Sequence, residues 1–425
     1  MMPGREIAII ALFVVTYLLI IRFYHRKSYV VWGSVLILLL SAILTPLQAL
    51  EAIDWNVILL YVGMLFVSEV FLWSKMPDYL ATIVASKAKR VGIAMLAICF
   101  MSGLLSIFLE NVAVVLLVAP VALSISKKCG INPVPLFIGI AISSNLQGAA
   151  TLIGDPPSML LAGFADMNFN DFFFINGKPG MFFAVQIGSI VSLFVLHYFF
   201  RKYHQPMPQL KKETYLSLVP SFLVLFLIAA LIISSVVPHS VSYMTGLLCV
   251  IFGVAGFLWY AARTKGKDTK EFIKRLDWDT GLFLIGIFIL VRSLAVSGIL
   301  EDIAQGILGI GAGNTFLIYM MIIGISVVLS AFIDNVPFLV AMLPVVQIIS
   351  DKLGASPYLF FFGLLLGASI GGNITPVGAS ANIVAMGIMK KKGYHPSFME
   401  FVRMGLPFTL CSVLASSLFI WMMFS

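Results

Sequence analysis

Charged residues are scarce in this chain of 425 residues. Asp, Glu, Lys and Arg together make up 11% of the sequence, whereas 60% of the residues are hydrophobic. A water-soluble domain needs far more charge on its surface, so the composition excludes an ordinary soluble protein. It predicts instead that lipid surrounds most of the chain.

Cysteine and histidine are also rare. The four cysteines (Cys99, Cys129, Cys249 and Cys411) lie far apart, which excludes the paired spacing of a metal site or a disulfide framework. The five histidines (25, 197, 204, 239 and 395) fall at the ends of apolar segments or in loops, which argues against a zinc enzyme in the membrane. No small-residue cleavage site follows the first apolar segment, so we expect a span there and not a signal peptide.

Many apolar segments reach spanning length, for which about 20 residues are required. The predicted crossings are 6–24, 29–50, 55–74, 133–165, 179–202, 215–237, 241–262, 279–298, 357–389 and 405–424. Two further apolar stretches, 91–126 and 314–350, each contain a polar pair at the middle, and we interpret both as re-entrant helical hairpins. The sequence thus predicts an all-α polytopic membrane protein with about ten transmembrane helices.

The positions of the basic residues test this arrangement, because cytoplasmic loops are enriched in Lys and Arg. On the predicted spans, 23 of the 27 basic residues fall on one side. They include Lys27 in the first loop and Lys211 and Lys212 in a later one. Only Arg5, Lys178 and Lys352 fall on the other side, and Arg292 lies within a span. We therefore expect both termini outside the cytoplasmic membrane, and we attribute the net charge of +8 to orientation and not to nucleic-acid binding.

The two halves of the chain match each other. "IDWNVILLYVGMLF" from residue 53 aligns with "LDWDTGLFLIGIFI" from 276, placing Asp54 over Asp277. "SIFLENVAVVLLVAP" from 106 aligns in the same way with "SAFIDNVPFLVAMLP" from 330. Because each half has an odd number of crossings, the second half is predicted to be inverted, as in many secondary transporters.

The repeats set the predicted domain boundaries. An extra first helix and basic loop occupy 1–28, and repeat 1 occupies 29–202 with its hairpin at 91–126 and a broken helix at 133–165. A linker and extra helix follow at 203–240. Repeat 2 occupies 241–425, with its hairpin at 314–350 and a broken helix at 357–389.

Polar breaks interrupt both broken helices. The stretch "NLQGAATLIGDPPSMLLAG" (145–163) has its counterpart in "SIGGNITPVGASANIVAMG" (369–387). Glycine and proline prevent a continuous helix there, and the backbone groups that a break frees are tolerated only beside protein or a watery cavity. In transporters such groups bind ions and substrates near the bilayer midplane.

Three acids, Glu110, Asp155 and Asp334, fall at predicted mid-membrane breaks. An unpaired charge there costs several kcal/mol, and no Lys or Arg lies at any break in the sequence. We therefore expect the acids to be protonated, paired with a cation or hydrated, as suits a site that carries H⁺ or Na⁺. The alternative is a helix-capping role, above all for Asp155 before its two prolines.

Glu69 and Arg292 occupy equivalent positions in the two halves with opposite charge. We interpret them as a structural ion pair or a dimer contact, or else as gating residues.

These motifs resemble the ion transporter superfamily, which includes citrate and dicarboxylate symporters, arsenite permeases and the melanosomal P-protein. The likeness runs from about residue 30 to the end, and "IGDPPS" and "GASANIVAMG" are most similar to the P-protein and arsenite-permease branch. The resemblance implies a scaffold domain, a transport domain that moves like an elevator, and a homodimer.

The resemblance also implies two symmetry-related Na⁺ positions, one near Asn111 and Gly154 and one near Asn335 and Gly378, with H⁺ as the other candidate coupling ion and no further cofactor. Together with the breaks, it gives a predicted substrate and ion site. This site comprises Glu110, Asn111, Asn145, Thr151, Gly154, Asp155, Asp334, Asn335, Asn373, Thr375, Gly378, Ser380 and Asn382.

One departure from the family bears on the substrate. Dicarboxylate symporters carry Ser and Thr around the Asn of each hairpin tip, where this chain has Glu110 and Val112, then Asp334 and Val336. Added negative charge favours a cation, or a neutral or weakly acidic oxyacid such as arsenite, coupled to H⁺ or Na⁺. The alternatives are a sodium-coupled di- or tricarboxylate symporter, an intramembrane aspartyl enzyme using Asp155 and Asp334, and a channel.

Overall fold

The structure is a computed structural model that describes residues 3–23, 26–208, 214–237 and 243–425. Nine helices among these residues are long and apolar enough to cross a membrane. They are α4 (Trp55–Trp73), α7 (Asn111–Cys129), α10 (Met181–Phe200), α11 (Val219–Val236), α12 (Met244–Arg263), α14 (Trp278–Ser297), α17 (Asn335–Leu353), α18 (Pro357–Gly371, continued by the 3₁₀ turn η3 at Gly372–Ile374) and α20 (Phe398–Phe424).

Further helices complete the fold. They are α1 (Pro3–Arg22), α2 (Lys27–Leu40), α3 (Pro46–Glu51), α5 (Met76–Ser86), α6 (Val91–Ser106), α8 (Val134–Gly148), α9 (Pro156–Phe164), α13 (Thr269–Arg275), α15 (Ile299–Gly311), α16 (Thr315–Ser330) and α19 (Ser380–Lys391), with a 3₁₀ turn η2 at Asn170–Phe172. One small antiparallel ribbon pairs β1 (Phe174–Ile175) with β2 (Lys178–Pro179). The prediction of an all-helical membrane protein is confirmed at this level.

The predicted continuous crossing at 29–50 is wrong. α2 ends at Leu40, and α3 starts separately behind a capping box in which Thr45 and Gln48 exchange side-chain and backbone hydrogen bonds. This reciprocal bonding satisfies the first free amides of a new helix, so the chain stops and restarts. Two short helices, α5 and α15, follow α4 and α14 and were not predicted from the sequence.

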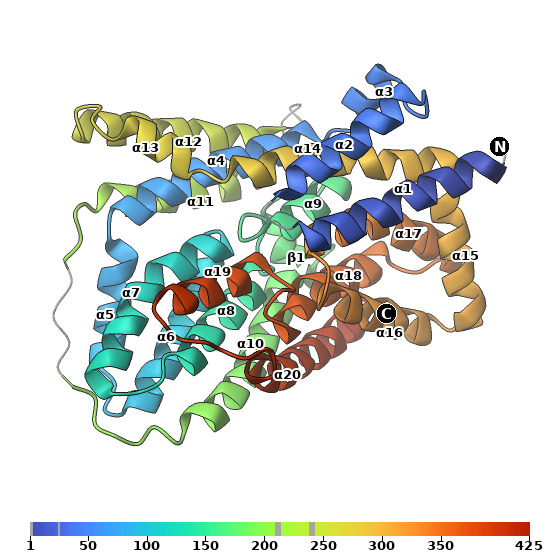
Figure 1. The fold of residues 1–425 in the computed structure, drawn as a ribbon. Coiled ribbons are helices and arrows are strands. Elements are labelled where there is room, and N and C mark those ends of the chain that lie inside the picture. The colour runs from blue at the N-terminus through green and yellow to red at the C-terminus, as the bar shows by residue number, and fades with distance from the viewer. Residues whose placement is uncertain (1–2, 24–25, 209–213, 238–242) are drawn as a thin grey trace.

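The helices pack in pairs that join distant parts of the chain (Figure 1). α4 packs on α12, and α14 packs on α2, so each pair joins one helix from the first half to one from the second. The same exchange occurs between α7 and α19 and between α9 and α17. α10 packs along α20. These contacts bring the ends of the interrupted helices together inside the molecule.

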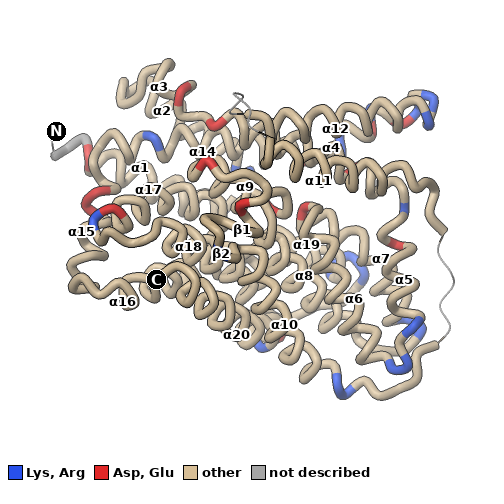
Figure 2. Tube along the Cα trace, turned by 180° about the vertical axis from the view of Figure 1, so that it is seen from behind, with Lys and Arg blue, Asp and Glu red and all other residues tan. Residues whose placement is uncertain are grey.

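Basic residues gather at one end of the protein (Figure 2). Lys and Arg cluster around α13 and the neighbouring ends of α5 and α7, whereas the acids of α3 and α15 lie at the opposite end. Of the residues named from the sequence, His25, Lys211, Lys212 and His239 lie outside the described part of the chain, as do 209–213 and 238–240 of the predicted linker.

Candidate functional site

The predicted breaks are present, and each of the three acids caps a helix. Glu110 accepts a hydrogen bond from the amide of Ala113 at 3.0 Å at the start of α7, and Asp334 accepts one from Val336 at 3.2 Å at the start of α17. Asp155 accepts one from Ser158 at 3.0 Å at the start of α9. A carboxylate at a helix N-terminus satisfies a free amide and is favoured by the helix dipole. Capping therefore occurs at all three positions, and in each case it occupies a single carboxylate oxygen.

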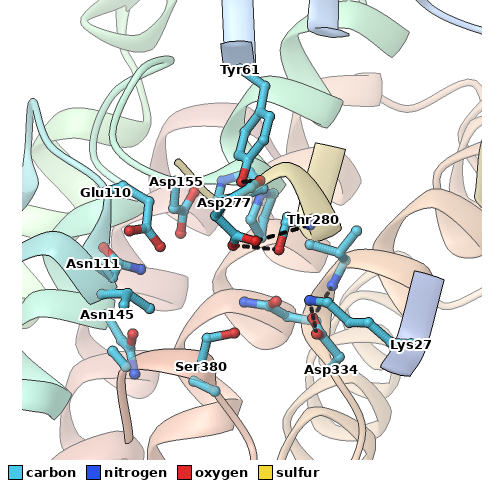
Figure 3. A pocket seen from close by; sticks show the side chains of 17 residues that line it. Lys27, Tyr61, Glu110, Asn111, Asn145, Asp155, Asp277, Thr280, Asp334 and Ser380 are labelled. Atoms are coloured by element: carbon cyan, nitrogen blue, oxygen red, sulfur yellow. Dashed lines mark hydrogen bonds and ion pairs between the residues drawn. The ribbon is translucent and has the colours of Figure 1, made fainter. Parts of the chain in front are cut away.

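A cavity lies where these helix ends converge (Figure 3). Its walls come from α2, α4, α7, α8, α9, α14, α17 and α19. The volume open to the centre of a water molecule is about 40 Å³. That is room for roughly three water molecules. The predicted residues that line it are Glu110, Asn111, Asn145, Asp155, Asp334, Asn335 and Ser380.

The expectation that no basic residue neutralises the acids is wrong. Lys27, at the first turn of α2, lies with its Nζ 3.2 Å from Oδ2 of Asp334, and each side chain is only 7% exposed. The same ammonium stands 4.6 Å from the centre of the Phe283 ring. Lys27 was assigned to a basic loop because it falls between the predicted spans 6–24 and 29–50, but it begins a helix and its side chain is buried in the protein.

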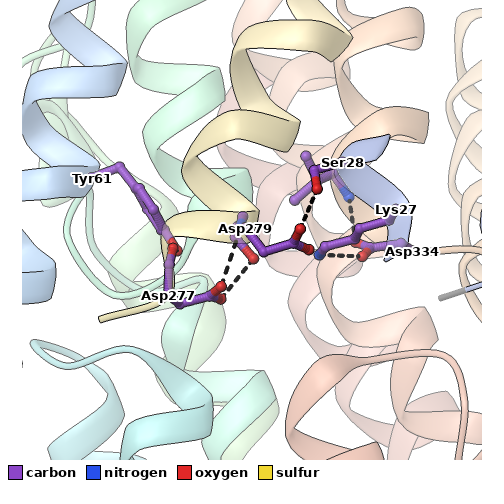
Figure 4. A network of polar contacts seen from close by, with 8 residues as sticks. Lys27, Ser28, Tyr61, Asp277, Asp279 and Asp334 are labelled. Carbon is purple, nitrogen blue, oxygen red and sulfur yellow. Dashed lines mark hydrogen bonds and ion pairs between the residues drawn. The ribbon is translucent and has the colours of Figure 1, made fainter. Parts of the chain in front are cut away.

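Sequence reasoning also missed a polar network on α14 (Figure 4). Asp277 caps α14 by accepting bonds from the amide and the hydroxyl of Thr280, at 3.1 and 2.7 Å. Its backbone carbonyl accepts a bond from the hydroxyl of Tyr61 at 3.2 Å, and Ser28 donates to Asp279. Asp277, Thr280 and Tyr61 all line the cavity. The alignment of Asp277 with Asp54 marks a helix start that occurs in both repeats. It was the one feature of the sequence that could have pointed to this network.

Carboxamides connect the two broken helices. The Nδ2 of Asn145 on α8 donates to Asn373 Oδ1 at 2.9 Å and to Asn382 Oδ1 at 3.0 Å. Asn382 in turn donates to the carbonyls of Gly372 and Thr375, at 3.0 and 2.9 Å. Free carbonyls of one break are thus satisfied by a side chain that is itself held from the other half of the chain.

The remaining predicted residues do not line the cavity. Thr151 donates to the Ile107 carbonyl, and Thr375 donates to the Ala331 carbonyl, so each hydroxyl ties a broken helix to a hairpin tip. Gly154 and Gly378 lie where a side chain would meet backbone: an added Cβ would lie 3.0 Å from the Ser106 carbonyl oxygen, or 2.8 Å from that of Ser330. With Asn373 and Asn382, these residues hold the breaks in shape.

Glu69 and Arg292 do not form an ion pair with each other among the described residues. The Glu69 carboxylate pairs with Arg275 at 3.6 Å, and Arg292 lines a separate cavity with Glu51 and Asp54. The expectation of a direct pair therefore has to be corrected.

The comparisons with known proteins agree on a transporter. Residues 5–361 match the family model described as citrate transporter, CitMHS. An uncharacterized transporter of Mycobacterium tuberculosis, MT2759, is 32% identical over 87% of this chain and 86% of its own length. The P protein of Sus scrofa is 26% identical over 96% of this chain and 58% of that protein. Among solved structures, the YdaH transporter of Alcanivorax borkumensis superposes with a TM-score of 0.60 at 14% identity, covering 88% of this chain and 85% of that one.

Proposed function

The chain belongs to the CitMHS citrate transporter family, and we propose that this membrane transporter is secondary active, moving a small ion or oxyacid coupled to H⁺ or Na⁺. The family and its relatives are transporters and not enzymes, which removes the intramembrane aspartyl enzyme as an alternative. The observation that carries the proposal is the composition of the buried cavity. Four carboxylates (Glu110, Asp155, Asp277 and Asp334) and one ammonium (Lys27) line it.

Such a cavity favours cations. Burial away from bulk water strengthens the field of each charge, and four acids against one base leave a negative surplus when all are ionised. A proton or a sodium ion offsets this surplus, which makes cation binding a condition for a stable site. Changes in that occupancy then alter how an anion or a neutral solute binds, which is the physical basis of coupled transport.

The repeat supports alternating access of the elevator type. Matching Asp54 with Asp277 makes α4 the equivalent of α14, and the proposed repeat boundaries make α2 the equivalent of α12. The observed pairs α4–α12 and α14–α2 are then equivalent contacts related by the repeat. The pairs α7–α19 and α17–α9 are related in the same way. We propose that α2, α4, α12 and α14 form the scaffold, and that the hairpins α6–α7 and α16–α17 move with the broken helices.

The cavity lies between these two groups. Lys27, Tyr61 and Asp277 come from the proposed scaffold, whereas Glu110, Asp155 and Asp334 come from the proposed moving part. A displacement of one group against the other would break the Lys27–Asp334 pair and change the charges that face the substrate. The pair therefore links the conformation to the charge of the site.

The clustering of basic residues around α13, α5 and α7 supports a cytoplasmic location for that end, with both termini outside an inner membrane. We further propose a homodimer, as the superfamily resemblance implies. Exposed apolar side chains on α11, such as Phe226 (63%) and Ile233 (61%), offer a surface for lipid or for a second copy.

Sodium-coupled symport of a di- or tricarboxylate is the second candidate, favoured by the family description. A carboxylate would meet four acids in the cavity, so it would have to enter together with cations that offset its charge. The small volume in this structure favours an ion over a tricarboxylate, unless the cavity widens during transport.

The test uses purified protein in proteoliposomes that contain a pH-sensitive dye. A proton gradient is imposed, and Na⁺, Li⁺, arsenite, citrate and succinate are added one at a time. A response to Na⁺ or Li⁺ alone would identify a cation/proton exchanger, and a response only to arsenite or a carboxylate would identify a proton-linked solute transporter. Labelled citrate or succinate uptake driven by Na⁺, with no dye response, would favour the second candidate. Silence in both assays, in vesicles that hold their gradient, would contradict the proposal.

A further inference from the structure

Three buried oxygens near the start of α9 lack hydrogen-bond partners. They are Oδ2 of Asp155, Oγ of Ser158 and Oγ of Ser369, none of which has a partner among the described residues. Asp155 is 1% exposed, Ser158 is fully buried, and Ser369 is 1% exposed. The Ser158 and Ser369 hydroxyls lie beside the Asp155 carboxylate, and neither makes a hydrogen bond with it.

Three such atoms in one place require an explanation, because buried polar groups in folded proteins are nearly always paired. A carboxylate oxygen and two hydroxyls could simply bond to one another if they stood close enough. None of the three makes such a bond, so each oxygen is available to a ligand placed among them. Oxygens that share a cation at about 2.4 Å lie about 3.4 Å apart or more, which is beyond an ordinary O–H···O bond.

The elements around this group explain how it forms. Asp155 caps α9 through Oδ1, which accepts the bond from the Ser158 amide. This bond holds the carboxylate in place and leaves Oδ2 free for another partner. Ser158 lies one turn along α9, and Ser369 comes from α18, which packs against α9. The three oxygens are therefore held by helices that pack together, and the site adjoins the acidic cavity because Asp155 also lines it.

We propose that Asp155, Ser158 and Ser369 bind a sodium ion as the coupling cation. This inference rests on the proposed function and assigns its coupling site. One carboxylate and two hydroxyls form a donor set of hard oxygens with a single negative charge, which suits a monovalent alkali cation better than Mg²⁺ or a transition metal. The Lys27 ammonium is engaged by Asp334, so the charge compensation at Asp155 falls to the ion.

The site differs from the two Na⁺ positions expected from the sequence. At the first of those positions the Asn111 side-chain oxygen accepts a bond from Ser106 at 2.5 Å, and the nearby Ile107 carbonyl is taken by Thr151. At the second, the Ala331 carbonyl is taken by Thr375. These three oxygens are already partnered, whereas Oδ2 of Asp155 and the hydroxyls of Ser158 and Ser369 are not.

The test measures sodium binding without transport. Thermal unfolding of the purified protein is followed against NaCl, with choline chloride holding the ionic strength constant, because a ligand that binds the folded state raises the unfolding temperature. We expect a saturable rise with Na⁺ in the wild type. Asp155→Asn, Ser158→Ala and Ser369→Ala should each raise the half-saturating Na⁺ concentration at least tenfold. Ser68→Ala, which removes another buried unpartnered hydroxyl on α4, should leave it unchanged.

Several results would overturn the assignment. One is a wild type that gains no stability from Na⁺ or Li⁺. Another is a sodium response that survives in Asp155→Asn, or one that Ser68→Ala weakens as much as Ser369→Ala does. Proteoliposome flux is measured separately. Flux without sodium binding would refute this site and leave the proposed transport function standing. Sodium binding without flux of any substrate tested would support the site and contradict the proposed transport function.

Discussion

Lys27 and Asp334 lie 307 positions apart in the sequence, yet the Lys27 ammonium stands 3.2 Å from the Asp334 carboxylate and both side chains are almost fully buried. The pair connects the first turn of α2 to the tip of the hairpin formed by α16 and α17. It places the one basic group of the cavity between two parts of the protein that we propose move against each other.

Removing the ammonium should destabilise the fold. Lys27→Ala leaves a buried carboxylate without its partner, which typically costs about 3–5 kcal/mol. The double variant Lys27→Ala/Asp334→Asn should recover most of that loss, because no uncompensated charge remains, but it should not recover transport. Unfolding in detergent and uptake in vesicles measure the two effects, with Lys89→Ala on the exposed surface as the control. Equal stability of Lys27→Ala and the wild type would show that the pair contributes nothing to the fold.

The hairpin-tip asparagines should matter for transport more than for folding. Asn111→Ala and Asn335→Ala each remove a carboxamide that lines the cavity, so we expect loss of uptake in protein that still elutes as a folded species. Asn132→Ala, at an exposed loop, should transport normally. Normal flux in both tip variants would remove these residues from the site.

Asn145 should matter for stability. Its amide bonds to both Asn373 and Asn382, and Asn145→Ala leaves two buried oxygens unpaired. Each buried group that loses its partner costs about 1–3 kcal/mol. The unfolding temperature of this variant should fall below that of Asn132→Ala. If it does not, water replaces the lost bonds and the link between the broken helices is dispensable.

Two glycines at the breaks should not tolerate a side chain. In Gly378→Ala the new Cβ would lie 2.6 Å from the Gly372 carbonyl oxygen, and Gly154→Ala meets the Gly148 carbonyl in the same way. Forcing such contacts costs about 1–3 kcal/mol and shifts the backbone, so both variants should lose stability and transport. Gly324→Ala, in α16 with nothing within 4 Å, is the matched control and should behave as the wild type.

Local signals predicted the breaks well. Glycine, proline and an acid at 154–157 stop one helix and cap the next, and the chemistry needs no information from elsewhere in the chain. The hairpin tips at Glu110 and Asp334 were predictable for the same reason. The capping box at Thr45–Gln48 was equally readable, and the division of 29–50 into two helices could have been found from it.

The composition of the cavity could not be predicted in the same way. Lys27 and Asp277 lie in or beside basic loop sequences, and only the packing of α2 and α14 against the hairpins brings them to the acids. Conversely, Thr151 and Thr375 have the residue type of ion ligands but serve as ties between breaks and hairpins. Residue type and depth in the membrane do not distinguish an ion ligand from a structural tie. Each of these roles places a hydroxyl beside a free backbone carbonyl.

The central claim is that the acids of this cavity carry the coupling of transport. The most direct measurement compares the initial rate of substrate-dependent proton or sodium movement in vesicles containing the wild type, Glu110→Gln, Asp334→Asn or Glu301→Gln, at equal amounts of folded protein. The two cavity variants should lose at least tenfold in rate, while Glu301→Gln, on the exposed surface of α15, should match the wild type. Wild-type rates in both Glu110→Gln and Asp334→Asn would contradict the account.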